Sequence, residues 1–285
     1  MSKSLVLCFL YKTALGRMIL KLLVQPEVSR VAGKFLSSGL SKWLVKYYIW
    51  KHKIVMDNIE IPAKGFSSFN DFFIRKRRIE YYDLTQDHLI SPCDGFLTYV
   101  KIKKNSVFEI KNTRFSLEDL LDDHKLAMEF QNGTALIFRL TPANYHRYCY
   151  VANGRILYFR RIKGKLHCVR PIALRVVPVF VQNSREYQVI KTDKFGTMIQ
   201  MEIGALLVGK IKNYRQPLRQ DNIKAGEEKG YFEFGGSTII VLLKENSICF
   251  NGKLYEKKNS NREIMVHMGE CVARTKKERR LCNGK

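Results

Sequence analysis

The chain has 285 residues, is 46% hydrophobic and 12% aromatic, and carries a formal net charge of +24 at pH 7. This composition excludes a wholly disordered chain, because it supplies enough apolar surface for a packed core. The charge predicts a polyanionic partner, either nucleic acid or an anionic membrane surface. The 7 cysteines lie scattered without a CxxC pair. This pattern argues against a disulfide framework and against a metal site, and it suits a reducing compartment.

Residues 1–56 are basic, with ten lysines or arginines and one acid, Glu27. Short apolar clusters alternate with lysines, and both tryptophans lie between residues 43 and 50. Basic amphipathic helices with aromatic anchors are typical of segments that lie at a membrane interface. The alternative is an ordinary helical layer over the core. No apolar run reaches the roughly 18 residues needed to span a bilayer, so we expect a peripheral, membrane-associating region.

Residues 57–85 form a predicted connector. Phe69, Phe72 and Phe73 recur at helical spacing within FSSFNDFFIRKRR, so we expect them to dock the connector on the core. The basic run 75–78 that follows is expected at a charged surface.

From residue 86 the pattern becomes that of strands, which favours an α+β protein. We expect N-terminal amphipathic helices and a predominantly antiparallel β-sandwich or barrel catalytic core over residues 86–273, with a polar tail over 274–285. A short helix is predicted at FSLEDLL, with Ser116 as its N-cap. The predicted strands are Phe96–Ile102, Thr134–Leu140, Arg155–Arg161, Glu186–Lys191, Met198–Ile203, Ala205–Ile211, Gly230–Phe234 and Thr238–Leu243.

Three loops combine a reactive side chain with turn residues. Asp94 lies in the tight turn SPCDG, where an aspartate commonly bonds its own backbone. His146 lies in the loop LTPANYHRYCYVANG, where a histidine can exchange a proton near neutral pH or serve a structural role. Ser237 follows two glycines and begins an apolar strand.

The two glycines before Ser237 have two possible explanations. They form an ordinary turn between two strands, or they make the backbone there open to cleavage. A glycine at position 236 has access to backbone conformations that expose its carbonyl to attack by the next hydroxyl. Such an attack needs a base for the Ser237 proton, and an Asp–His pair is the usual one. No G-x-S-x-G elbow is present, which disfavours an α/β-hydrolase serine.

Taken together, these motifs resemble those of the phosphatidylserine decarboxylase family. SPCDG, YHR, EIGALLVGKI and FEFGGSTIIVL occur in the family's order and approximate spacing, with FNDFFIRK before them and EIMVHMGE after them. The resemblance covers roughly residues 60–272.

The resemblance implies a self-processing enzyme. The chain would break between Gly236 and Ser237, giving a β chain 1–236 and an associated α chain 237–285 whose first residue is a covalent pyruvoyl group. That cofactor would form a Schiff base with phosphatidylserine of an anionic membrane and yield phosphatidylethanolamine and CO2. The resemblance further implies Asp94 in the Asp–His–Ser processing set and His146 in acid–base work.

The chain departs from the family's pattern at one position. Many members carry a second histidine three residues after the first, and here that residue is Cys149. Either His146 serves both steps, or another histidine replaces the missing one. His167, in KLHCVRP, is the tentative candidate because members with YHRYC resemble this chain there.

Other interpretations of the sequence stay open. One is a pyruvoyl-dependent decarboxylase of a soluble amino acid; another is a non-catalytic basic β-domain that binds a membrane or nucleic acid. The absence of an RNP-type strand or recognition-helix motif argues against nucleic acid. A family member without activity is a third, because of Cys149. We expect a peripheral protein on the cytoplasmic face of a bacterial cell membrane, and a homo-oligomer is left open.

Overall fold

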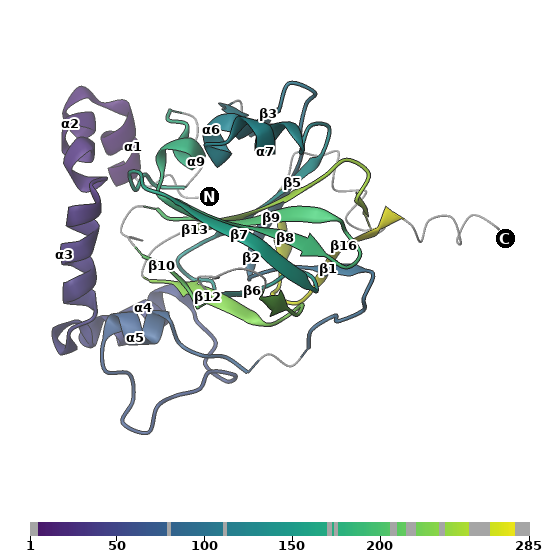
Figure 1. Cartoon of the computed structure of the whole chain (residues 1–285). Helices are drawn as coiled ribbons and strands as arrows, with labels where there is room; N and C mark the ends of the chain where they lie inside the picture. Colours follow the sequence, from purple (N-terminus) through teal and green to yellow (C-terminus); the bar gives the residue numbers. More distant parts are fainter. Residues whose placement is uncertain are drawn as a thin grey trace.

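The computed structural model describes residues 5–78, 81–110, 113–169, 173, 176–205, 210–214, 221–233, 237–250 and 263–276. It confirms an α+β fold whose described strand pairs are antiparallel, apart from one isolated parallel bridge. Helices from the first part of the chain stand along one side of the strands (Figure 1).

The N-terminal part is a series of short helices. Thr13 caps α2, because its side chain accepts a hydrogen bond from the Gly16 N–H. Pro26 occupies the first turn of α3, where its missing N–H costs no bond. Lys53, in the left-handed conformation, ends α4. The elements are α1 (Leu5–Lys12), α2 (Ala14–Leu23), α3 (Pro26–Leu36), the 3-10 turn η1 (Gly39–Ser41), α4 (Trp43–His52) and α5 (Phe69–Phe73).

An eight-stranded sheet forms the centre of the molecule, in the order β11-β7-β8-β9-β13-β5-β2-β15. Its central strand β13 reads STIIVLL and is buried along its whole length, between β9 and β5. The strand bounds are β2 (Gly95–Lys101), β5 (Thr134–Leu140), β7 (Gly154–Ile162), β8 (Arg185–Thr192), β9 (Thr197–Ile203), β11 (Asn222–Ile223), β13 (Ser237–Leu243) and β15 (Ile264–Val266).

One face of this sheet is largely apolar and packs on short helices. Side chains alternate along each strand, and Tyr187, Met201 and Ile240 lie in register on this face. The Tyr187 hydroxyl donates to the Leu121 carbonyl of α6. The helices near this face in Figure 1 are α6 (Leu117–Leu121), α7 (His124–Met128) and α9 (Val179–Gln182).

The opposite face is unusually polar although it is buried. Glu186 pairs in register with Glu202, and Gln188 with Gln200, and all four side chains are at most 5% exposed. A three-stranded sheet, β10-β12-β6, lies across this face (Figure 1). Its strands are β10 (Ile211–Asn213), β12 (Glu228–Phe232) and β6 (Arg147–Cys149). We call the layer between the two sheets, with the side chains of Glu186, Gln188, Gln200, Glu202, Lys229 and Ser237, the polar interlayer.

Two smaller groups of strands complete the fold. A second three-stranded sheet has the order β1-β16-β14, and β3 and β4 form a hairpin before α6. Their bounds are β1 (His88–Ile90), β3 (Val107–Ile110), β4 (Thr113–Ser116), β14 (Ile248–Cys249) and β16 (Cys271–Thr275).

Most of the predicted elements are confirmed. The strand Thr134–Leu140 has the predicted bounds, and the Ser116 side chain accepts from the Asp119 N–H at the start of α6. The barrel alternative is wrong for the described residues, because β11 and β15 are the two open edges of the large sheet. The predicted strand 205–211 falls largely on residues outside the described ones.

Two predictions near charged residues need correction. Residues 274 and 275, expected in the polar tail, belong to β16 because they pair with β1 and β14. Arg75, expected at a charged surface, is 6% exposed because its guanidinium packs 4.8 Å from the centre of the Phe72 ring. Phe69, Phe72 and Phe73 are buried, as predicted.

Candidate active site

Ser237 is the first residue of β13 and is completely buried. It lies opposite Leu140 of β5, and Thr238 lies opposite Ile203 of β9. The Ser237 Oγ has no hydrogen-bond partner among the residues that the structure describes. A buried hydroxyl without a partner is costly, so this group is a candidate for function. Gly236, the predicted cleavage partner, lies outside the described residues.

His146 lies beside the chain that leads to Ser237. Its backbone carbonyl accepts from the Phe232 N–H at the end of β12. The imidazole is fully buried, its Nδ1 lies 2.8 Å from the Asn144 carbonyl oxygen, and its ring centre lies 4.1 Å from that of Phe73. Since a carbonyl only accepts, Nδ1 carries the proton and Nε2 is the basic nitrogen.

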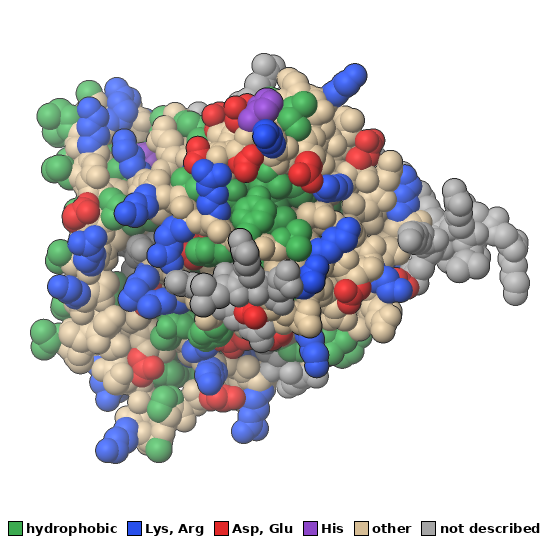
Figure 2. Space-filling model, viewed as in Figure 1, with side chains coloured by type: hydrophobic (Ala, Val, Ile, Leu, Met, Phe, Trp, Pro, Cys, Tyr) green, Lys and Arg blue, Asp and Glu red, His purple; other side chains and the backbone are tan. Residues whose placement is uncertain are grey.

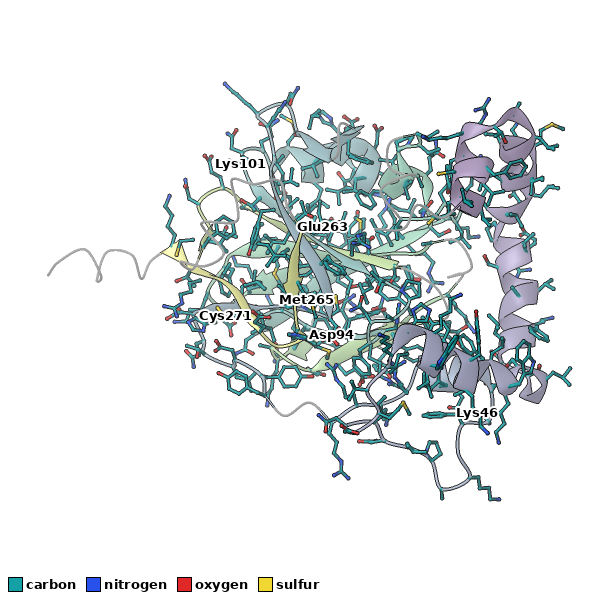
Figure 3. The ribbon with its side chains drawn as sticks, turned by 180° about the vertical axis from the view of Figure 1, so that it is seen from behind. Lys46, Asp94, Lys101, Glu263, Met265 and Cys271 are labelled. Carbon is teal, nitrogen blue, oxygen red and sulfur yellow. The ribbon has the colours of Figure 1, made fainter. Side chains whose placement is uncertain are left out.

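Asp94 lies in the turn before β2, as predicted, but its contacts differ from those of a serine–histidine set. Its two carboxylate oxygens accept from the Arg77 guanidinium at 2.6 and 3.1 Å, and one also accepts from the Met268 N–H at 2.9 Å. A third neighbour is His267, whose Nδ1 lies 3.9 Å from Asp94. Asp94 lies near the β15 side of the sheet, where Met265 is labelled in the view from behind (Figure 3).

Cys149 is a buried thiol near the Asp94 turn. Its Sγ lies 3.8 Å from the Ser91 carbonyl oxygen, and its N–H donates to the Pro92 carbonyl. Burial raises the pKa of the Cys149 thiol. The group therefore stays protonated near neutral pH and cannot serve as the base that a histidine would provide.

His167 lies close to the end of β9. Asn183 connects the two segments, because its side chain accepts from the His167 N–H and donates to the His167 and Gly204 carbonyls at 2.7–2.8 Å. The His167 ring is 6.3 Å from that of Tyr11 in α1, and its Nδ1 has no partner among the described residues. Burial, and then Lys165, lower the pKa of His167, so its imidazole is neutral near pH 7.

A buried ion pair occupies the polar interlayer. Lys229 of β12 donates from its Nζ to Glu202 Oε2 of β9, and both side chains are 0% exposed. Asn213 completes the cluster, because its side chain accepts from Lys229 and donates to Glu202 and Glu186. Burial raises the pKa of Glu202 and lowers that of Lys229, while their mutual attraction favours the charged forms.

The structure thus places the predicted residues in different surroundings. The His146 carbonyl is hydrogen-bonded to Phe232 and His167 is connected to Gly204 at the end of β9, whereas Asp94 is bonded to Arg77 of the connector. The sequence interpretation did not single out Arg77, Glu202, Lys229 or His267. The quoted motifs EIGALLVGKI and EIMVHMGE contain Glu202 and His267, but nothing in the sequence pattern marked Lys229, which lies 27 residues from its partner.

Three side chains elsewhere have metal-ligating atoms within 4.8 Å of one another, namely Asp83, His88 and Cys271. Asp83 and His88 already share a 2.7 Å hydrogen bond. Burial raises the pKa of the Cys271 thiol to about 11, so the free thiol is protonated near neutral pH. The group lies between the connector and β1/β16 and contains none of the candidate site residues.

The N-terminal helices present apolar and basic side chains together to the exterior. Trp43 and Trp50 of α4 are 67% and 75% exposed, and Leu40 is 75% exposed. Figure 2 shows green apolar and blue basic side chains along the edge occupied by α1, α2 and α3. Among the described residues, none of the helices is both long and apolar enough to cross a lipid bilayer.

These helices also reach toward the candidate site. The Tyr48 hydroxyl of α4 donates to the Pro142 carbonyl in the loop that carries His146. The Tyr11 hydroxyl of α1 accepts from the Cys168 N–H next to His167, and the Val24 carbonyl accepts from the Leu166 N–H. The helices that carry the exposed apolar side chains are therefore hydrogen-bonded to the segments that carry His146 and His167.

Comparison with known proteins places these features in a family. The phosphatidylserine decarboxylase family model matches residues 69–274. A relative from Clostridium acetobutylicum, phosphatidylserine decarboxylase proenzyme 2, is 42% identical over 94% of this chain and 91% of its own length. Phosphatidylserine decarboxylase proenzymes of Ruminiclostridium cellulolyticum and Fusobacterium nucleatum are 38% and 35% identical, each over 92% of this chain and over 89% and 88% of their own lengths.

Proposed function

The chain belongs to the phosphatidylserine decarboxylase family, and on this premise we propose that it cuts its own backbone between Gly236 and Ser237 and then converts phosphatidylserine to phosphatidylethanolamine and CO2. The observation that carries the proposal is the environment of Ser237. Its hydroxyl is completely buried at the start of a fixed central strand, and it lacks a partner among the described residues. Such a hydroxyl is free to react, and the neighbouring strands hold it in one position while it does so.

The cleavage follows from the chemistry of a serine that succeeds a glycine. The Ser237 oxygen forms an ester bond to the Gly236 carbonyl carbon, while the amide C–N bond breaks and the nitrogen gains a proton. Elimination then releases Gly236 as a free carboxylate, and hydrolysis with loss of ammonia leaves a pyruvoyl group at position 237. Because β13 pairs with both β5 and β9, the two products would stay together after the cut.

The pyruvoyl group supplies an electron sink for decarboxylation of an amine substrate. At position 237 such a group would sit at the start of β13, held between the neighbouring strands β5 and β9. His146, with Nδ1 directed at the Asn144 carbonyl and Nε2 as its basic nitrogen, is suited to hold and deliver the proton that replaces the carboxylate.

Asp94 and His167 have separate roles in this scheme. Asp94 accepts hydrogen bonds from Arg77 and Met268, so it would act by holding the turn beside Cys149. His167 is neutral and is connected to Gly204 through Asn183, so it would act as an acid–base group near the end of β9.

We further propose that helices α1–α4 hold the protein on the anionic surface that contains its substrate. Exposed tryptophans and leucines would enter the headgroup region, and lysines would contribute about 1 kcal/mol each near an anionic surface. The connections from Tyr48 and Tyr11 to the site support a position close to the bilayer. This surface favours a lipid substrate over a soluble amino acid.

Intact masses of the purified protein test the cleavage. We expect two chains, one that ends at Gly236 and one whose first residue is a pyruvoyl group, and a single uncut chain for Ser237→Ala. One intact chain for the unsubstituted protein would overturn the mechanism. Release of CO2 from phosphatidylserine but not from free serine would then identify the substrate class.

Vesicle sedimentation tests the membrane surface. The full chain should bind vesicles containing phosphatidylserine, and binding should weaken as salt rises because surface charges are screened. A protein without residues 1–56 that is still folded and binds equally well would contradict this part of the proposal.

A further inference from the structure

Ser237 and Glu202 lie on the same face of the large sheet. Ile239 and Glu202 are directly opposite each other in the β13–β9 ladder, and Ser237 is two residues before Ile239. Continuing the register by one residue beyond the Thr238–Ile203 pair places Gly204 opposite Ser237. Glu202 is then the diagonal neighbour of Ser237, a relation in which backbone positions are about 7–8 Å apart.

Gly204 places no side chain at the position opposite Ser237. Because a glycine has no side chain, no other side chain of β9 stands between the position of Glu202 and that of Ser237 on this face. The strand register therefore places the carboxylate-bearing residue diagonally opposite the hydroxyl-bearing one.

The two oxygens of the Glu202 carboxylate have different environments. Oε2 accepts hydrogen bonds from Lys229 and Asn213, whereas Oε1 is buried and has no partner among the described residues. Ser237 Oγ is in the same condition. An acceptor and a donor, both buried and both without a partner among the described residues, thus lie at diagonal positions of two neighbouring strands on one face of the sheet.

We propose that Glu202 is the base that takes the Ser237 proton during self-cleavage, and that Lys229 is the positioning residue that keeps Glu202 ionised and oriented. The inference rests on the proposed role of Ser237 as the attacking residue. Glu202 Oε1 accepts the hydroxyl proton as the oxygen bonds to the Gly236 carbonyl carbon. The same proton passes to the Ser237 nitrogen when the C–N bond breaks, which regenerates the carboxylate.

A glutamate base would explain how the chain can cut itself with a cysteine, rather than the family's second histidine, at position 149. The Cys149 thiol cannot act as a base, and the hydrogen bonds of Asp94 come from Arg77 and Met268, with His267 at 3.9 Å. Glu202 supplies a carboxylate from a different strand, and the buried Lys229 ammonium offsets the cost of holding its charge in the interior.

Cleavage rates of three substitutions test the proposal, each followed by gel and intact mass from the time of synthesis. Glu202→Gln should slow cleavage at least 100-fold. Glu202→Asp keeps the charge that Lys229 needs but withdraws the carboxylate by one methylene, and it should slow cleavage at least tenfold. The matched control is Glu263→Gln, which changes a carboxylate that is paired with Arg139 outside the polar interlayer and should leave the rate within fivefold.

A double substitution separates catalysis from structure. Glu202→Gln leaves the Lys229 ammonium buried without its partner, so the variant also loses stability. In Glu202→Gln with Lys229→Gln the uncompensated charge is gone, and melting should return toward that of the unsubstituted chain while cleavage stays slow. Cleavage at the normal rate in this folded double variant, or in Glu202→Asp, overturns the role of Glu202. If the unsubstituted chain itself does not cut at 236/237, the proposed function fails and this inference falls with it.

Discussion

The Arg77–Asp94 pair should be a measurable part of the stability of the site. Arg77 belongs to the connector and Asp94 to the turn before β2, and two charge-assisted hydrogen bonds of 2.6 and 3.1 Å join them. The side chains are 26% and 10% exposed, so the pair is intermediate between a surface pair and a buried one. Surface pairs contribute about 0–1 kcal/mol, and breaking a buried pair costs about 3–5 kcal/mol.

For Arg77→Met we therefore expect a loss of about 2–3 kcal/mol in the free energy of unfolding. This corresponds to a fall in melting temperature of roughly 4–8 °C for a protein of this size. The assay is urea unfolding followed by circular dichroism. All variants should carry Ser237→Ala, because a chain that is cut in two does not unfold in a two-state manner.

A double-mutant cycle with Asp94→Asn tests the cause. If the two residues act through their mutual bonds, the double variant should lose about 1–2 kcal/mol less than the sum of the single losses. Losses that add to within about 0.5 kcal/mol would refute the reasoning, since they would show that each side chain stabilises the fold independently.

Three further predictions concern other parts of the site. Cys149→Ala should lower the free energy of unfolding by about 1–2 kcal/mol. The rate of self-cleavage, measured by intact mass, should not change, because the protonated thiol accepts no proton. A folded variant that no longer cuts would contradict this. Phe73→Leu removes the ring whose centre lies 4.1 Å from that of His146. It should lower the free energy of unfolding by about 1–2 kcal/mol and lower kcat, because the ring positions His146. An unchanged kcat would show that it does not. Trp43→Ser and Trp50→Ser should each weaken vesicle binding about five- to thirtyfold, because each loses about 1–2 kcal/mol of apolar burial in the membrane. The melting temperature should change little. Unchanged binding would show that α4 does not contact the membrane.

The sequence was sufficient for the local elements and for the family. A run such as STIIVLL predicts a buried strand by its own composition, and Ser116 with Asp119 three residues later predicts a helix start; both are confirmed. The order of the short motifs was enough to indicate the family, which the comparisons confirm. These features depend on interactions between residues that are neighbours in the chain, so the sequence alone is enough to predict them.

The tertiary structure decided which polar groups share the interior. Arg75 belongs to a basic run that the sequence places at the surface, yet it is buried because α5 turns its side chain onto Phe72. The Met268 N–H that donates to Asp94 lies 174 residues away, and Lys229 lies 27 residues from Glu202. Strand register and the stacking of one sheet on another bring such groups together, and a buried charge must find its partner in space rather than in sequence.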